Sequence, residues 1–181
     1  MYHEKRRNKL NIFVRECIRD ALLALMKEKP LDKITVTEII TRSGVSRMGF
    51  YRNYESKESV IEDFILTVFE NTVTKIEEER PLDLRSYKII ETSLENFTLY
   101  ADYIKMFLDQ GLDTLLLSCY KKAYYIITPD DGKSELRYFY NELFIANLFA
   151  LECAWVRSGM KQSPQKLAKL YSRILKMQSR I

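Results

Sequence analysis

The sequence is poor in glycine and proline, and it has few stretches in which apolar and polar residues alternate. Only 5 of its 181 residues are glycine and 4 are proline. Sandwiches and barrels need many tight turns, and a strand with one buried face alternates at every second residue. The scarcity of both features argues against a β fold. Apolar residues recur every three to four positions instead, which predicts an all-α protein of about nine helices.

Side chains that commonly carry catalysis are also few. The chain has one histidine, His3, and three widely spaced cysteines, Cys17, Cys119 and Cys153. It contains no Cys-x-x-Cys pair, no His-x-x-x-His pair and no glycine-rich phosphate loop, which zinc sites and nucleotide-binding enzymes require. We therefore expect no enzyme, no catalytic residue, no metal site and no cofactor. Scattered thiols of odd number are typical of a reduced, cytoplasmic protein.

Long hydrophobic runs are absent as well. The most apolar stretch, Leu143 to Leu151, is interrupted by Asn147 and bounded by Glu142 and Glu152. It is far shorter than the ~20 residues that a membrane-spanning helix needs. The N-terminal end is rich in lysine and arginine and lacks the apolar centre of a signal peptide. The sequence therefore predicts no membrane partner and a cytoplasmic location.

The positive charge is unevenly distributed along the chain, whose net charge is +4. Residues 1–60 hold 13 basic and 8 acidic residues, whereas residues 61–181 hold 16 basic and 17 acidic residues. The positive field therefore lies on the first third of the chain. Such a field is expected of a part that binds a polyanion such as DNA.

One stretch, residues 34–60, has the pattern of two short helices joined by a tight turn and followed by a third helix. Thr35 and Glu38 have the spacing of a capping box, which begins the first helix. Gly44 is placed to end that helix in a left-handed conformation, and Ser46 is placed to cap the second. This order of helix, glycine turn and short helix predicts a helix-turn-helix, whose second helix enters the major groove of DNA.

The same stretch resembles the N-terminal DNA-binding domain of the TetR family of bacterial transcriptional regulators. The matching residues are Ile34, Thr35, Val36, Glu38, Ile39, Ser43, Gly44, Val45, Ser46, Phe50, Tyr51, Ser56, Lys57 and Glu58. The resemblance covers the first third of the chain and implies a dimeric regulator with an all-helical body. The sequence departs from the family pattern at Gly49, where Thr, Ser or Ala is usual, at Asn53, where His is common, and at Tyr54, where Phe is common.

The residues of the motif that do not belong to its core are expected to face DNA. The first turn of the second helix reaches the base edges, and the predicted base-reading residues are Ser46, Arg47, Met48 and Gly49. The guanidinium of Arg47 has the fork that binds guanine, and Met48 can cover a thymine methyl group. Contacts with phosphates position a protein without reading sequence. They are predicted for Thr35, Thr37, Tyr51, Arg52, Asn53 and Lys57.

The chain is expected to fall into three parts. These are a helix-turn-helix domain at 1–55, a connecting helix at 56–80 and a helical effector-binding and dimerisation domain at 81–181, which begins with a short linker at 81–83. A first helix is predicted over residues 10–29, preceded by a basic segment at 1–9. Two interpretations of that segment remain open: a frayed, solvated terminus, or an arm that follows the phosphates or the minor groove.

Aromatic residues are concentrated in the third part. One interpretation is a cavity that accepts a small hydrophobic ligand, lined by residues that include Tyr103, Phe107, Tyr120, Tyr124 and Trp155. The other is an ordinary core, because aromatic residues at helical spacing usually pack inside. No ionisable residue stands out within an apolar face as an anchor for such a ligand.

The helix predicted at 134–157 is apolar around nearly its whole circumference, so it should be buried on more than one side. We expect this helix and the last one, which begins at Ser163 and Pro164, to form a two-fold dimer interface, with packing inside one chain as the alternative. The predicted interface residues are Phe144, Leu148, Leu151, Leu167, Leu170, Tyr171 and Ile174.

These observations predict a dimeric DNA-binding transcriptional regulator. The resemblance implies a repressor that binds a palindromic operator in double-stranded DNA and is released by a small hydrophobic ligand. Two heads one helical turn apart, ~34–36 Å, would read such a palindrome. The alternative is an interaction module, a co-activator or adaptor whose body binds another protein and has no small-molecule effector.

Overall fold

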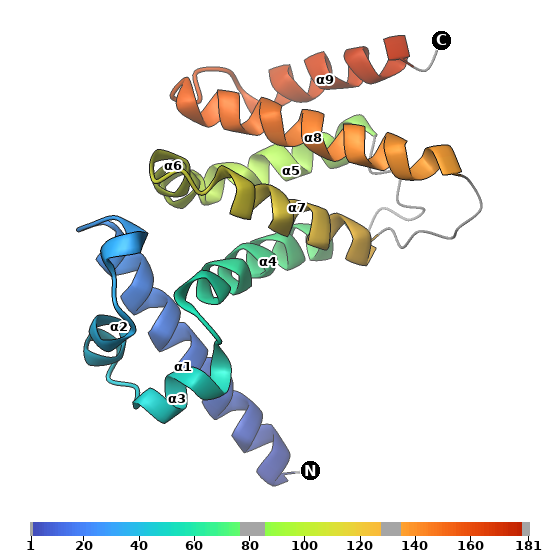
Figure 1. Cartoon of the computed structure of the whole chain (residues 1–181). Helices are drawn as coiled ribbons and strands as arrows, with labels where there is room; N and C mark the ends of the chain where they lie inside the picture. Colours follow the sequence, from blue (N-terminus) through green and yellow to red (C-terminus); the bar gives the residue numbers. More distant parts are fainter. Residues whose placement is uncertain (1, 77–85, 128–134, 179–181) are drawn as a thin grey trace. The chain divides into compact units, whose positions relative to one another are not determined.

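The computed structural model describes residues 2–76, 86–127 and 135–178, and all of the regular structure in these ranges is helical (Figure 1). This confirms the predicted all-α fold. The helices are α1 Tyr2–Met26, the 3-10 helix η1 Leu31–Lys33, α2 Val36–Ser43, α3 Arg47–Asn53, α4 Lys57–Ile76, α5 Tyr87–Leu99, α6 Ala101–Asp109, α7 Asp113–Ile127, α8 Glu135–Arg157 and α9 Pro164–Gln178.

The chain divides into two compact units, residues 1–65 and residues 66–181. The division falls inside α4, which contributes Lys57–Ile65 to the N-terminal unit and its remaining turns to the C-terminal unit. The connecting helix predicted at 56–80 therefore corresponds to α4 as far as Ile76. The predicted linker at 81–83 lies outside the described residues.

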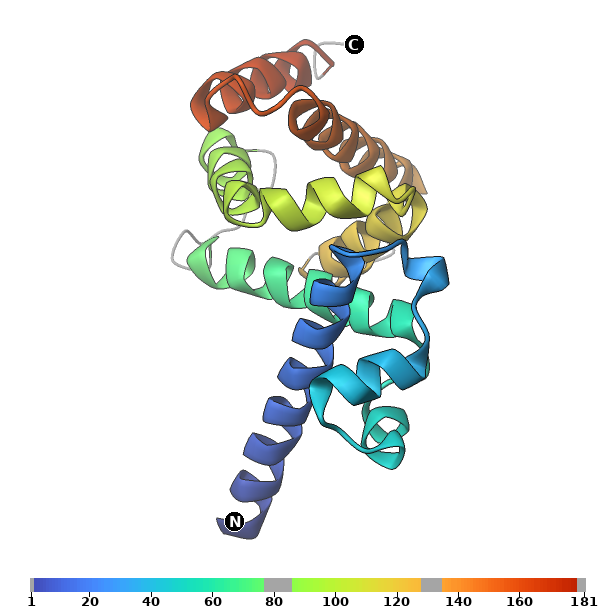
Figure 2. The same cartoon turned by 90° about the vertical axis from the view of Figure 1, so that its left-hand side faces the viewer.

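The N-terminal unit is built on α1, against which α2 and α3 pack. Its core consists of apolar side chains spaced three or four residues apart, such as Ile18 and Leu22 on α1, which meet Ile39 of α2 and Phe50 of α3 in full burial. Burial of each such side chain contributes about 1.5–3 kcal/mol. The helix is longer than predicted, because the backbone of the basic segment at 2–9 is part of α1 rather than an arm that precedes it (Figure 2).

Two glycines with a left-handed backbone follow helices, and the first of them, Gly44, ends its helix where the sequence predicts. Gly44 follows α2 with φ of 68°, and Gly159 follows α8 with φ of 76°. Both values lie in the left-handed region, which a residue without Cβ adopts at little cost. The Gly44 turn sets the direction in which α3 leaves α2.

The C-terminal unit contains α5 to α9 and the second part of α4. Helix α9 packs along α5, whereas α8 contacts α6 and α7 (Figures 1 and 2). The core is formed by fully buried side chains such as Leu94, Phe107, Cys119 and Ile145.

Helix α8 is buried on one side only in a single chain. Its opposite side exposes large apolar residues, among them Leu136, Tyr140 and Leu143, which is 61% exposed. These positions are spaced three or four residues apart and so lie on one stripe of the helix. Within one copy of the chain, the core covers one side of α8, and the second side, which the sequence also predicts to be buried, is exposed.

No helix in the described ranges is both long enough and apolar enough to cross a membrane.

Candidate functional site

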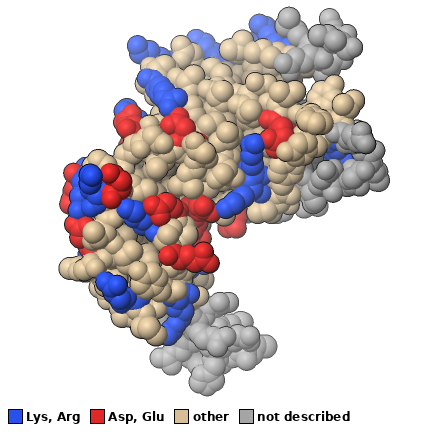
Figure 3. Space-filling view, in the orientation of Figure 1, with Lys and Arg blue, Asp and Glu red and all other residues tan. Residues whose placement is uncertain are grey.

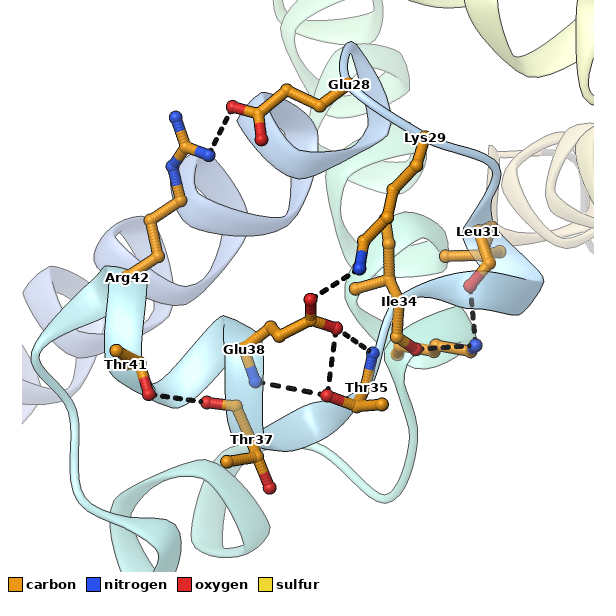
Figure 4. A network of polar contacts seen from close by, with 10 residues as sticks. Glu28, Lys29, Leu31, Ile34, Thr35, Thr37, Glu38, Thr41 and Arg42 are labelled. Atoms are coloured by element: carbon orange, nitrogen blue, oxygen red, sulfur yellow. Dashed lines mark hydrogen bonds and ion pairs between the residues drawn. The ribbon is translucent and has the colours of Figure 1, made fainter.

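The two helices of the motif begin at side chains that cap them. The Thr35 hydroxyl accepts a hydrogen bond from the Glu38 N–H at 3.3 Å, and the Glu38 carboxylate accepts one from the Thr35 N–H at 2.9 Å, which completes the predicted capping box (Figure 4). The Ser46 hydroxyl accepts from the Gly49 N–H at 3.0 Å at the start of α3. The sequence therefore sets the ends of both helices locally.

Glu38 connects α2 to the end of α1. Its carboxylate forms an ion pair with Lys29 and also accepts a hydrogen bond from the Thr35 hydroxyl (Figure 4). The hydrogen bond from Lys29, followed by those from Thr35, lowers the pKa of Glu38 to about 2. Because this carboxylate remains ionised in mild acid, the start of α2 keeps its cap there.

The start of α3 presents the predicted base-reading residues to solvent. Ser46, Arg47 and Met48 are exposed, and Met48 has 74% of its surface accessible. The Arg47 guanidinium donates to the Thr37 hydroxyl at 3.0 Å, so a residue of α2 orients a side chain of α3. Thr37 was predicted to bind phosphate, and the structure brings it directly beside a base-reading residue.

Gly49 is only partly exposed, and its missing side chain would point into the turn. A Cβ atom at this position would lie 2.7 Å from Cγ1 of Val45 and 3.2 Å from Oγ of Ser46. Val45 is β-branched and therefore stiff. The departure from the family pattern at Gly49 thus has a packing reason, and its base-reading role stays a prediction.

The residues predicted to bind phosphate differ in how free their polar groups are. Tyr51 and Arg52 are exposed at the end of α3. Figure 3 shows basic and acidic side chains on one face of the N-terminal unit. The Asn53 amide donates to the Gly49 carbonyl at 2.8 Å. The Lys57 ammonium donates to the carbonyls of Leu31 and Ile34 at 2.5 and 2.9 Å.

Tyr54 is buried as predicted, but its hydroxyl has a role that the sequence did not reveal. It donates to the Asp63 carboxylate at 2.6 Å, and Arg15 forms an ion pair with the same carboxylate while lying 5.3 Å from the centre of the Tyr54 ring. Burial, and then the neighbouring Asp63, raises the pKa of the Tyr54 hydroxyl. These three residues join α1, the end of α3 and the start of α4.

In the C-terminal unit, the predicted ligand-contacting residues differ in exposure. Phe107, Tyr120 and Trp155 are buried, whereas Tyr103 and Tyr124 are partly exposed. The Tyr124 hydroxyl donates to the Asn141 side chain at 3.0 Å. The Trp155 indole donates to the Gln162 carbonyl at 3.0 Å.

Glu152 is the functional candidate that the sequence analysis missed. It is fully buried in α8, accepts a hydrogen bond from the Tyr120 hydroxyl, and has its second oxygen, Oε1, buried without a partner in the described part of the chain. Burial holds the pKa of its carboxyl well above the usual range. Its spacing of four residues from Leu148 and seven from Ile145, both buried, was the available signal.

The predicted dimer residues are divided between core and surface. Phe144, Leu148, Leu167 and Tyr171 are buried by their own chain, and the Tyr171 hydroxyl donates to the Phe144 carbonyl at 3.0 Å. Leu151 is partly exposed, whereas Leu170 and Ile174 of α9 are exposed. The first four residues therefore form the core of a single chain, and the exposed apolar surface lies elsewhere on α8 and α9.

The capped pair α2 and α3, the left-handed turn at Gly44 and the exposed start of α3 define a helix-turn-helix protein. Residues 18–64 match the model of the bacterial regulatory proteins of the tetR family. Residues 18–64 therefore form a TetR-type DNA-binding domain, as the resemblance implied.

Comparison with known proteins extends this result to a relative and to the fold. The chain is 46% identical over 48 residues to the uncharacterized HTH-type transcriptional regulator YxbF of Bacillus subtilis, a match that covers 26% of this chain and 13% of that protein. A TetR transcriptional regulator from Streptococcus agalactiae superposes with a TM-score of 0.63 and 19% identity, covering 94% of this chain and 98% of the other. The fatty acid degradation regulator FadR from Bacillus halodurans superposes with a TM-score of 0.53 and 17% identity, covering 89% of this chain and 93% of the other. At these identities the two structures establish the fold alone.

Proposed function

We propose that the protein is a dimeric transcriptional repressor that binds a palindromic operator through α3 and is released by a small hydrophobic ligand. The observation that carries the proposal is the exposed first turn of α3, which contains Arg47 and Met48. Ser46 caps this turn, and the Thr37 hydroxyl accepts a hydrogen bond from Arg47. A recognition helix of this kind reads bases with its N-terminal residues.

The residues of α3 have separate roles in this proposal. Arg47 forms two hydrogen bonds with a guanine, and Met48 packs on a thymine methyl group. Arg52 and Tyr51, exposed further along the helix, contact phosphates and hold α3 in the groove. The positive balance of residues 1–60 supplies the long-range attraction.

The exposed apolar stripe of α8 supports a homodimer. Leu136, Tyr140 and Leu143 lie on that stripe, and Leu170 and Ile174 are exposed on α9. A second copy would cover them, because exposed apolar surface of this kind marks an interaction site. The dimer surface is therefore proposed on these residues rather than on the four that are buried within one chain.

The test begins with selection of bound duplexes from a random DNA pool, followed by affinity measurements at several salt concentrations. We expect a palindromic consensus and an affinity that falls steeply with salt, since several phosphates are neutralised. Arg47→Ala should relax the preference at one base position in each half-site by about 1–3 kcal/mol. Its matched control, Arg52→Ala, should weaken all sequences alike and lower the salt slope by about 1.

The result that would overturn the proposal is equally direct. A chain that remains folded and dimeric yet selects no duplex would exclude an operator-binding role. It would favour the interaction-module alternative, in which the body binds another protein. A chain that binds DNA as a monomer would remove the two-fold arrangement.

A further inference from the structure

The carboxyl of Glu152 is a buried polar group whose hydrogen bonds are incomplete. Its Oε2 accepts from the Tyr120 hydroxyl, and a hydrogen bond with the Ser93 side chain lowers the pKa of the carboxyl, against the larger effect of burial. Its Oε1 is nevertheless buried with no donor at hydrogen-bond distance among the described residues. Buried acceptors are nearly always paired, because an unpaired one keeps the cost of its lost hydration. An oxygen left in this condition marks a place where a hydrogen-bond donor is missing.

Tyr120, which binds the Glu152 carboxyl, is surrounded by aromatic rings, two of which are partly exposed at the surface of the C-terminal unit. The Tyr120 ring makes edge contacts with Phe69, Phe97 and Phe149, with centroids 4.4, 6.4 and 5.2 Å away. Phe97 is buried, whereas Phe69 and Phe149 are partly exposed. Solvent therefore reaches two of the three rings that surround the Tyr120 ring.

We propose that Glu152 anchors a ligand that combines an amine nitrogen with an apolar body. The nitrogen donates to Oε1 of Glu152, and the apolar body packs among Phe69, Phe149 and Tyr120 in place of their mutual contacts. This inference rests on the proposed function for its regulatory meaning, because such a ligand would be the effector that releases the operator.

The chemistry of the site favours an amine over an alcohol or an acid. A protonated amine supplies the charge that a buried carboxylate needs, and it is attracted to the faces of the rings. Burial raises the pKa of the Glu152 carboxyl, so any proton that the carboxyl carries passes to solvent when an ammonium group binds to the carboxylate. An acid would place a second acceptor against Oε1 and leave it unpaired.

Through Phe69, a bound ligand can change the packing of helix α4, to which this residue belongs. This ring belongs to α4, and the same helix supplies Lys57–Ile65 to the N-terminal unit. A ligand that displaces Phe69 from the Tyr120 ring therefore changes the packing of α4 within the C-terminal unit. Differential packing of this kind is what a ligand needs to shift a conformational equilibrium.

The experiment uses the full chain and three probes of equal shape: 4-phenylbutylamine, 4-phenylbutanol and pentylbenzene. Binding is measured by calorimetry and by the shift in thermal unfolding, for the unaltered chain and for Glu152→Gln. We expect the amine to bind at least tenfold more tightly than the other two probes. We expect Glu152→Gln, which keeps the shape but cannot ionise, to remove that advantage.

Equal binding of the amine and the alcohol would overturn the proposal, as would an amine advantage that survives in Glu152→Gln, or no binding of any probe. If Glu152→Gln does not fold, the comparison of the three probes on the unaltered chain still decides. Phe69→Leu serves as a second variant, since loss of a ring should weaken all three probes while preserving the preference for the amine.

DNA binding is measured separately and without probe. If the chain selects no operator but distinguishes the amine, the proposed regulatory function fails and the site at Glu152 stands. If the operator is bound but the probes are not distinguished, only the site fails.

Discussion

The N-terminal and C-terminal units place their polar side chains in opposite ways. In the N-terminal unit, the polar contacts of the motif are short-range and partly exposed, such as the capping box of Thr35 and Glu38. In the C-terminal unit, two amides and a carboxyl, those of Asn96, Asn141 and Glu152, are buried. The first arrangement gives a rigid reading surface, and the second stores polar groups in a low-dielectric interior where a ligand has most effect.

The largest effect should come from the core of the N-terminal unit. Phe50→Ala removes a fully buried ring and should cost about 3–5 kcal/mol. Circular dichroism follows the helices of both units, while fluorescence of the single tryptophan, Trp155, follows the C-terminal unit alone, so a transition seen only by circular dichroism belongs to the N-terminal unit. We expect the Trp155 transition to remain in place. If both transitions moved together, the two units would unfold as one and the comparison would lose its basis.

The second prediction concerns pH and the C-terminal unit. The folded pKa of Glu152 lies above its unfolded value of about 4.3, so the folded state holds the proton more tightly. This contribution to stability is complete below pH ~4.3 and is lost as pH rises through the folded pKa. The difference in unfolding free energy between the unaltered chain and Glu152→Gln should therefore fall with rising pH, by at most about 1.4 kcal/mol per pH unit.

Urea titrations followed by Trp155 fluorescence would measure that slope. The neighbouring hydroxyl of Tyr171 has a raised pKa, and burial raises the pKa of the Cys153 thiol to about 12, so neither interferes below pH 9. Parallel pH profiles for the two chains would show that Glu152 is ionised in the folded state.

A smaller effect should follow from Gly49→Ala. Alanine gains about 1 kcal/mol of helix propensity, but the new Cβ overlaps Cγ1 of Val45 and should cost about 1–3 kcal/mol. We expect a net loss of about 1 kcal/mol in chemical denaturation. In a Val45→Ala background the same change should instead stabilise, which a double-mutant cycle would measure. A cycle that shows no coupling would mean that Val45 moves aside freely.

The smallest effect should come from Tyr54→Phe, which restores the residue common in the family. The ring stays in the core, and one hydrogen bond to Asp63 is lost, for a cost of about 1 kcal/mol. Urea unfolding of the N-terminal unit checks this value. Asp63→Asn should cost more, since Arg15 also loses its charged partner. Equal stability of all three chains would show that this cluster contributes nothing to the unit.

The success of sequence reasoning follows the range of the interactions involved. Thr35, Glu38, Gly44 and Ser46 act within a few residues of their own position, so their spacing predicts where α2 and α3 begin and end. The start of α3 in turn predicts that Arg47 and Met48 are exposed. It does not predict the hydrogen bond between Arg47 and Thr37, which are ten residues apart in the sequence.

Long-range packing explains what could not be predicted in the C-terminal unit. Phe144 and Tyr171 lie on apolar helix faces that suit a dimer interface. In the structure they pack against each other and are buried within one chain. The exposed side of α8 bears equally apolar residues, so composition cannot tell its two sides apart. Glu152 was read as a polar boundary, yet its position four residues after Leu148 turns it inward.

The bonds of Lys57 have a consequence for chemical modification of the protein. Its ammonium group stabilises the connection between α1 and α2, because it donates hydrogen bonds to the carbonyls of Leu31 and Ile34. Acetylation of this amine would therefore remove a positive charge and also disrupt the hydrogen bonds that hold the connection between α1 and α2. A weakened grip on DNA after such treatment would report a loosened scaffold as much as a missing phosphate contact.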